Sequence, residues 1–121
     1  MDSKTVLLFK LQANICKTLA DPNRLMIVHE LRSGEKSVGQ MVSQLGLHQS
    51  NVSRHLAVLR ERDIVATRRE GTTIYYRLAN PTIAEACDLV RKVLAESLAH
   101  NQTLANSLNT LRDFVGRNSN G

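Results

Sequence analysis

Apolar residues recur at helical spacing in the first part of this 121-residue chain. Residues 4–20 carry a broad apolar face, and Ser3 is the expected N-cap of the helix that they form. Asp21 is expected to cap a second helix, with Pro22 at its first position and Gly34 after its end. The pattern therefore predicts two consecutive helices before residue 35.

Two shorter amphipathic helices are predicted over about residues 37–62. Ser37 is the expected N-cap of the first helix, and Gly46 closes it. The apolar face of the second helix consists of three residues at helical spacing: Val52, Leu56 and Leu59. Two short helices joined by a tight, glycine-containing turn are typical of a helix-turn-helix.

The hydrophobic period changes over about residues 64–78, which are rich in residues that favour strands. Glu70 and Gly71 form a turn signal in the middle of this stretch, so the sequence predicts a β-hairpin. An isolated hairpin is only marginally stable in water, and we expect it to pack on the preceding helices.

The last predicted helix starts at Asn80-Pro81 and runs to about residue 116, followed by a frayed tail over residues 117–121. Its apolar positions alternate in steps of four and three if Ser97 and Asn101 are polar members of the stripe. The apolar members are Ile83, Cys87, Val90, Leu94, Leu104, Leu108, Leu111 and Val115. A helix about 50 Å long exceeds what one small domain can cover, and a second copy of the chain could cover it.

These elements predict a mainly α fold with a small β-hairpin, in the order α-α-α-α-β-β-α. The chain length suits one domain, which we expect over residues 1–116. Only 3% of residues are aromatic, so leucine, valine, isoleucine and alanine must supply the core. The chain has neither an 18-residue apolar run nor the pattern of a secretory signal, so we expect a cytoplasmic protein without a membrane span.

The second helix of the predicted helix-turn-helix has a surface suited to the major groove of DNA. Ser50 and Ala57 are small, so the helix backbone could approach base edges, and Ala57 could contact a thymine methyl group. Gln49 and Asn51 can make paired hydrogen bonds to adenine, and Arg54 can bind the two acceptors of guanine. The net charge of +5 also favours a polyanionic partner.

Further residues are expected to lie along the phosphates of such a complex. Ser53 and His55 flank the predicted reading face, and Arg68, Arg69 and Thr72 lie at the tip of the hairpin. The hairpin would then act as a wing that contacts phosphates or the minor groove. A simpler interpretation of all these polar residues is a solvated helix face and a solvated turn.

Two other classes of function, an enzyme and a protein-binding adaptor, fit the sequence less well than DNA binding. The chain has no glycine-rich phosphate loop, no nucleophile elbow and no paired acid–histidine arrangement, so we do not expect an enzyme. A winged-helix adaptor for protein assembly is the alternative, but an adaptor would be expected to expose apolar residues where this chain has Gln49 and Arg54.

Three motifs in order, "LADPNRLMIVHEL", "HQSNVSRHLAVLRERDIV" and "REGTTIYYRL", resemble the ArsR/SmtB family of dimeric winged helix-turn-helix repressors over residues 5–98. The resemblance implies a homodimer whose interface is formed by the first and last helices, at about residues 4–20 and 80–116. It also implies a palindromic double-stranded DNA operator and release by an inducer, often a metal ion.

The chain departs from the metal-binding patterns of this family. The region over residues 37–53 has no cysteine. The family's four ligand positions at the last helix correspond in this chain to Asn80, Thr82, Val93 and Glu96, of which only Glu96 is a residue type that the family uses as a ligand there. A zinc site needs a nearly complete ligand set, so no metal site is predicted and any cofactor or small inducer is unknown.

Cys16 and Cys87 are the candidate inducer-sensing residues, because the family places their two helices together at the dimer interface. A disulfide or polysulfide bridge between the thiols, or a thiophilic metal or metalloid ion with a third ligand, could shift these helices. The alternative is that both cysteines are small buried hydrophobic residues.

Overall fold

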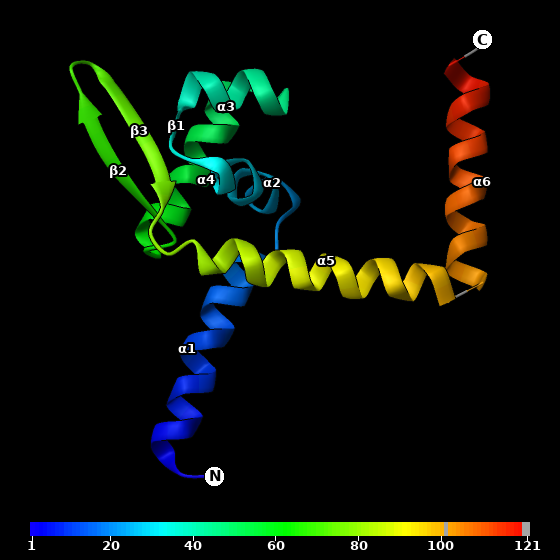
Figure 1. The fold of residues 1–121 in the computed structure, drawn as a ribbon, viewed down its shortest axis with the longest axis horizontal. Helices are drawn as coiled ribbons and strands as arrows, with labels where there is room; N and C mark the ends of the chain where they lie inside the picture. Colours follow the sequence, from blue (N-terminus) through cyan, green and yellow to red (C-terminus); the bar gives the residue numbers. More distant parts are fainter. Residues whose placement is uncertain (101, 120–121) are drawn as a thin grey trace. The chain divides into compact units, whose positions relative to one another are not determined.

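The computed structural model describes residues 1–100 and 102–119 (Figure 1). The elements, in chain order, are α1 (Ser3–Leu19), α2 (Pro22–Glu30), the 3₁₀ turn η1 (Leu31–Ser33), β1 (Lys36–Ser37), α3 (Val38–Leu45), α4 (Gln49–Glu61), β2 (Val65–Glu70), β3 (Thr73–Leu78), α5 (Thr82–His100) and α6 (Gln102–Ser119). The chain divides into two compact units, residues 1–85 and 86–121. The single domain expected over residues 1–116 stays a prediction.

The predicted helix-turn-helix is confirmed as α3 and α4. Ser37 caps α3 reciprocally: its hydroxyl accepts from the Gln40 backbone N–H at 3.2 Å, and its own N–H donates to the Gln40 side chain at 2.8 Å. Gly46 ends α3 with φ 66° and ψ 26°, in the left-handed region that favours glycine. The turn to α4 is therefore set by local chemistry at both ends of a short helix.

The predicted hairpin is confirmed as β2 and β3, which pair antiparallel from Val65 with Leu78 to Glu70 with Thr73. Gly71 begins the turn with φ 61°. The strand β1, which the sequence analysis did not predict, pairs with β3 and gives the sheet order β1-β3-β2. It has only two residues, too few for a periodic signal, yet it fixes the hairpin beside α3.

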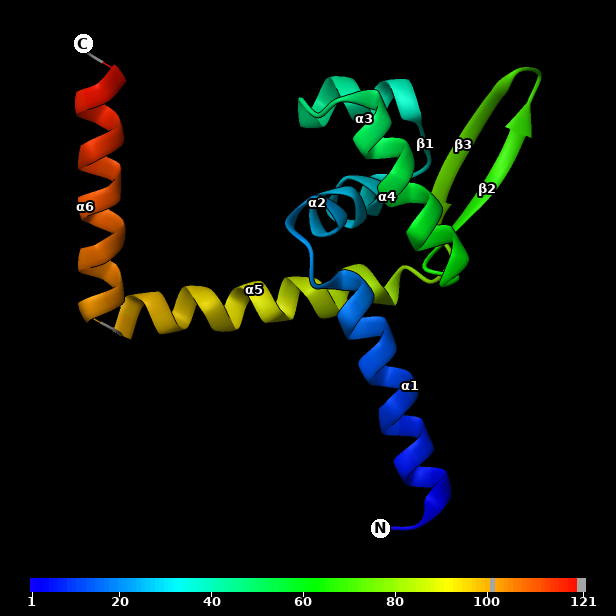
Figure 2. The same ribbon diagram turned by 180° about the vertical axis from the view of Figure 1, so that it is seen from behind.

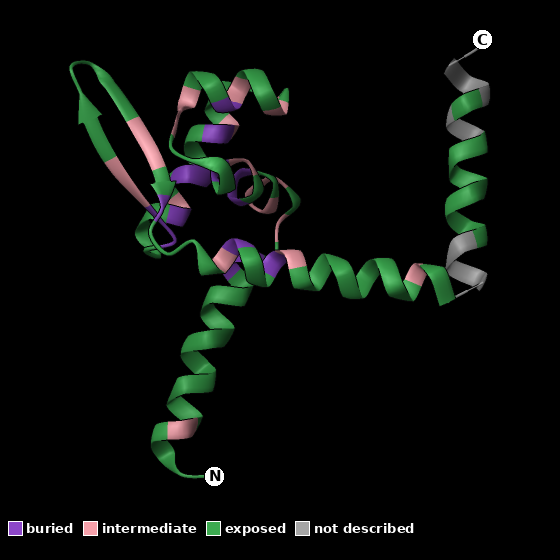
Figure 3. Ribbon diagram, viewed as in Figure 1, coloured by how far each residue is buried: buried purple, intermediate pink, exposed green. Residues whose placement is uncertain are grey.

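The core of the first unit lies where α2, α3 and α4 meet, and α4 packs against both other helices (Figures 2 and 3). Its largest fully buried side chains are Ile27, Val28, Met41, Val52, Leu56 and Leu59. Burial of one such side chain stabilises a fold by about 1.5–3 kcal/mol. The three members from α4 are those that the sequence predicted.

Three boundaries differ from the predictions. Asp2, rather than Ser3, caps α1, because its carboxylate accepts from the Thr5 N–H at 2.7 Å. The single helix predicted from residue 80 to 116 is described as two, α5 and α6, and residue 101 between them lies outside the described residues. Residues 117–119, predicted to be frayed, belong to α6, whereas residues 120–121 lie outside the description. None of the helices described has the length and apolarity needed to cross a membrane.

Candidate nucleic-acid interface

The helix α4 has one buried side and one exposed side. Val52, Leu56 and Leu59 have 0% exposure, which anchors the helix in the core. Over residues 49–57 the exposed residues of this helix are five: Gln49, Ser50, Ser53, Arg54 and Ala57. We call these five residues the reading face. All five were predicted, and the structure places them on the exposed side of one helix.

The reading face is polar without being bulky. Ser50, Ser53 and Ala57 have short side chains, which allow a helix backbone to approach a flat or grooved partner closely. Asn51, also predicted, is half-buried at the edge of this face, and its Oδ1 accepts from Arg54 Nη2 at 3.4 Å. This bond directs the Arg54 guanidinium along the first turns of α4.

The N-terminus of α4 lies at the start of the reading face. His48 is the N-cap, but its side chain makes no capping hydrogen bond, and the backbone N–H groups of Asn51 and Val52 both donate to its carbonyl. The first N–H groups of a helix and its dipole favour a negative charge beside them. A phosphate lying across this end of α4 would meet that requirement.

His55 does not lie where the sequence analysis placed it. It was predicted at the flank of the reading face, beside phosphates, but it is only 5% exposed and faces the core. Its Nδ1 accepts from Arg24 Nε at 3.3 Å, and its Nε2 lies 4.0 Å from Asp21 Oδ1. The amphipathic period explains the error: His55 lies next to Leu56 on the buried arc of α4, and its polarity was read as exposure.

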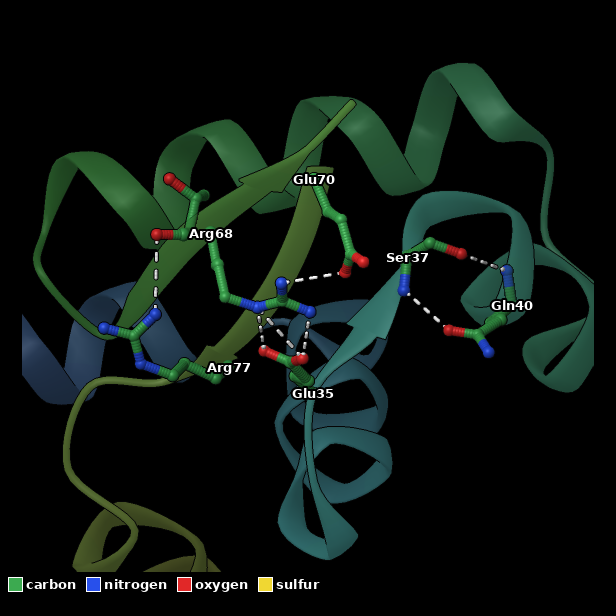
Figure 4. Close-up of polar contacts among 7 residues, drawn as sticks. Glu35, Ser37, Gln40, Arg68, Glu70 and Arg77 are labelled. Carbon is green, nitrogen blue, oxygen red and sulfur yellow. Dashed lines mark hydrogen bonds and ion pairs between the residues drawn. The ribbon is translucent and has the colours of Figure 1, made fainter. Parts of the chain in front are cut away.

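Arg68, predicted as a DNA contact of the wing, is held by two carboxylates (Figure 4). Its Nη2 donates to Glu35 Oε1 at 2.6 Å, its Nε lies 3.2 Å from both Glu35 oxygens, and its Nη1 donates to Glu70 Oε2 at 2.9 Å. Its guanidinium also lies 4.8 Å from the centre of the Tyr75 ring on the paired strand. We call Glu35, Arg68, Glu70 and Tyr75 the wing brace.

The wing brace stabilises the charged forms of Arg68 and Glu35. Hydrogen bonding to Glu35, and then to Glu70, raises the pKa of Arg68, and the guanidinium of Arg68 lowers the pKa of Glu35. Because these side chains are exposed, the ion pairs contribute little to stability. Their effect is on position and charge, since two carboxylates more than offset the single positive charge of Arg68.

Arg69 and Thr72 remain exposed at the tip of the hairpin. Successive side chains of a strand point to opposite faces, so Arg69 points away from the wing brace. Across the described part of the chain, no carboxylate forms an ion pair with Arg69. Of the two predicted wing arginines, Arg69 is therefore the one whose charge is available to a phosphate.

Sequence reasoning missed Glu35 and Arg24, which position two of the predicted residues. Glu35 is 33 positions from Arg68 and Arg24 is 31 positions from His55. Neither has a motif of its own, and each contact depends on tertiary structure. The local feature that could have pointed to Arg24 is the "DPNR" run, in which Arg24 follows the capping Asp21 by three residues.

Of the two cysteines, Cys16 is exposed on α1 and Cys87 is buried on α5. They belong to different compact units of the chain. Within residues 1–100 and 102–119, no group of three or more histidine, cysteine, aspartate or glutamate residues is arranged to hold a metal ion. The sensing role of the thiols stays a prediction.

Comparison with known proteins identifies the family. The family model described as "Bacterial regulatory protein, arsR family" matches residues 21–67, from α2 into β2. The HTH-type transcriptional regulator Rv0081 of Mycobacterium tuberculosis, described as uncharacterized, is 45% identical over 93 residues, or 76% of this chain and 82% of the relative. The chain belongs to the ArsR family. The crystal structure of Rv0081 matches this ArsR-family protein with a TM-score of 0.68, over 77% of this chain and 94% of that structure.

Three further matches show similarity in sequence or in fold. The biofilm growth-associated repressor of Xylella fastidiosa is 50% identical over 78 residues, which are 64% of this chain and 66% of the relative. The crystal structure of the repressor BigR from Xylella fastidiosa has a TM-score of 0.67 at 38% identity, over 77% of this chain and 96% of that one. The winged helix-turn-helix fragment of Mb0332 from Mycobacterium bovis, described as homodimeric, has a TM-score of 0.72 at 32% identity, over 84% and 94% of the chains.

Membership of this family confirms the winged helix-turn-helix fold that the sequence predicted. It also establishes the class of function: the protein is a DNA-binding transcriptional regulator and not an enzyme.

The two wing arginines should behave differently toward DNA. We expect Arg69→Ala to weaken binding to all duplexes alike and to reduce the slope of log K against log salt by about one, because one phosphate contact is lost. Arg68→Ala should change this slope by less than about half a unit, because the Arg68 charge is already paired. Fluorescence anisotropy over a salt series measures both slopes, and a fall with Arg68→Ala but not with Arg69→Ala would contradict this assignment.

Proposed function

We propose that this ArsR-family protein is a repressor that binds a palindromic operator as a homodimer and is released by an inducer. The observation that carries the proposal is the reading face, in which small and hydrogen-bonding side chains share one exposed side of an anchored helix. The similarity to a biofilm growth-associated repressor favours repression over activation. Because its target is DNA, the protein would act in the cytoplasm.

Base reading would fall to the first two turns of α4. Gln49 and Asn51 carry the paired donor and acceptor that suit adenine, and Arg54 carries the fork that suits guanine. Ala57 would lie against the groove floor, close to a thymine methyl group. Contacts to the phosphate backbone of the DNA would come from Ser50, Ser53, Arg69 and Thr72. His55 is buried and would make no such contact.

Exposed apolar side chains on α1 and α5 support the homodimer. On α1, Leu7, Leu8 and Phe9 are more than half exposed, at 56%, 64% and 53%. On α5, Leu89 and Val90 are 63% and 70% exposed. Large apolar surfaces on soluble proteins mark association sites, and the homodimeric Mb0332 fragment has the same fold. A two-fold dimer presents two reading faces, which is why the operator would be palindromic.

Cys16 and Cys87 are the proposed inducer-sensing residues. A thiol reaction at Cys16 would be accessible to solvent, whereas Cys87 is buried. A thiophilic metal or metalloid ion would need a third ligand beside these two. DNA binding through α4 requires neither mechanism, so the core of the proposal can be tested with the reduced protein alone.

The direct test of base reading is Arg54→Ala on a duplex selected from a random library. We expect a loss of about 1–3 kcal/mol and a relaxed base preference at one position of each half-site, because Arg54 would no longer bind a guanine. The matched control is Arg60→Ala on the same helix, which should leave the base preference unchanged. Titrations at one fixed salt concentration compare all single-base variants of the site.

Two results would contradict parts of this proposal. Equal weakening of every duplex by Arg54→Ala would exclude Arg54 as a base reader. Failure of the wild-type chain to select any duplex over bulk DNA would favour the adaptor function instead.

Val90→Glu should dissociate the dimer without unfolding the monomer, because this side chain is already 70% exposed within one chain. We expect the dimer dissociation constant to rise at least about tenfold, because an unpaired carboxylate would be buried at the interface. Sedimentation equilibrium measures this constant, and Lys92→Glu on the same helix is the control. An unchanged constant for Val90→Glu would place the interface elsewhere.

A further inference from the structure

A small polar cluster connects the end of α1 to the recognition helix. It consists of Thr18, Asp21, Arg24 and His55, and we call it the Arg24 junction. All four residues lie in the first compact unit, and none takes part in the reading face. The cluster interrupts a core that is otherwise made of aliphatic side chains.

The hydrogen bond between Arg24 and His55 fixes the state of the histidine ring. Arginine has only donors, so the 3.3 Å contact from Arg24 Nε requires a lone pair on His55 Nδ1. A neutral ring then carries its proton on Nε2, the nitrogen that lies 4.0 Å from Asp21 Oδ1. His55 is thus held between two groups from the start of α2.

The other end of the Arg24 guanidinium holds α1. Its Nη1 donates at 3.0 Å to the carbonyl of Thr18, in the last turn of α1, where carbonyl groups lack partners within the helix. Because the guanidinium is planar and rigid, its two contacts cannot move independently. The position of the α1 end and the position of His55 on α4 are therefore coupled through one side chain.

Asp21 fixes the start of α2, from which Arg24 projects. Its carboxylate accepts from the backbone N–H groups of Asn23 at 2.9 Å and Arg24 at 3.1 Å. The hydrogen bond from the Arg24 N–H is the main cause that lowers the pKa of Asp21, and the hydrogen bond from the Asn23 N–H and the charge of Arg24 lower it further. The carboxylate is thus kept charged beside the ring of His55.

The polar contacts of His55 bear on orientation more than on stability. Val52, Leu56 and Leu59 already anchor α4 in the core. Because apolar contacts are non-directional, they permit small rotations and shifts of the helix. His55 is adjacent to Arg54 and two positions from Ala57, so its fixed ring sets the direction in which the reading face points. Buried polar pairs specify geometry in some proteins at little or no gain in stability.

We propose that Arg24 is a positioning residue for sequence-specific DNA binding, which couples the end of α1 to the recognition helix through Thr18 O and His55 Nδ1. The inference rests on the proposed function of α4. It also supplies a route by which a change in α1, a proposed dimer helix, would reach the reading face.

The test is Arg24→Lys, which keeps the positive charge but provides one ammonium in place of a planar fork. We expect about a tenfold loss of affinity for the selected operator, with less than about a twofold change for unrelated DNA at the same salt. The salt slope should not change, because no phosphate contact is removed. Arg62→Lys, at an exposed arginine that is the C-cap of α4, is the control for the same change of side chain and should have no effect on either affinity.

A double-mutant cycle with His55→Leu locates the coupling. If Arg24 acts through His55, the losses in operator affinity from the two substitutions should not add. Additive losses, equal weakening of both DNA classes, or an unchanged operator affinity would each overturn the inference. Failure of the wild-type protein to select DNA would instead overturn the proposed function.

A spectroscopic measurement on the wild-type protein keeps the inference testable if the variants do not fold. Nitrogen-15 NMR of the histidine side chains should show His55 with its proton on Nε2 and a hydrogen-bonded lone pair on Nδ1. Observation of the proton on Nδ1 would overturn the inference without any DNA present.

Discussion

The burial of one side of α4 is the constraint on which the DNA-binding region depends. Val52, Leu56 and Leu59 have no exposure to solvent, and they hold the helix against α2 and α3. A helix anchored on one side must present its other side, and the residues there are short or able to form hydrogen bonds. The same 3.6-residue period therefore determines both the core and the candidate interface.

Two polar clusters fix the positions of the hairpin and of α4 more closely than the apolar core does alone. The wing brace ties Arg68 on β2 to Glu35 before β1, so the hairpin is fixed at both its base and its side. The Arg24 junction ties α4 to the end of α1. In both clusters an arginine uses its planar fork to join segments more than 30 residues apart in sequence. One consequence is that the arginines have different tasks: Arg54 and Arg69 are exposed and are the proposed DNA contacts, whereas Arg24 and Arg68 are paired with other segments of the chain.

Periodicity and capping chemistry were sufficient to predict the helices around the turn, the hairpin and the exposed side of α4. These features depend on neighbours within a few residues, such as the Ser37–Gln40 capping box and Gly46. The failures concern residues whose surroundings come from elsewhere in the chain. His55 was placed beside phosphates because it is polar, but it is buried, and its partner Arg24 is 31 positions away. The ion pair of Arg68 with Glu35, 33 positions away, was not predicted, and the contact of Arg68 with DNA stays a prediction. The two-residue strand β1 was missed because it is too short to show a period. The sensing role of Cys16 and Cys87 stays a prediction, because their proximity depends on tertiary geometry that no local pattern encodes.

We propose that the exposed side of α4 reads DNA. The most direct test is an NMR titration of the full chain with a selected operator duplex. The side-chain amide groups of Gln49 and Asn51 and the Nε–H of Arg54 would be followed, with the exposed Asn106 of α6 as the internal reference. If α4 reads DNA, the three α4 signals shift with the operator and shift far less with unrelated DNA, while the Asn106 signal does not shift. Unchanged α4 signals at saturating operator would contradict it.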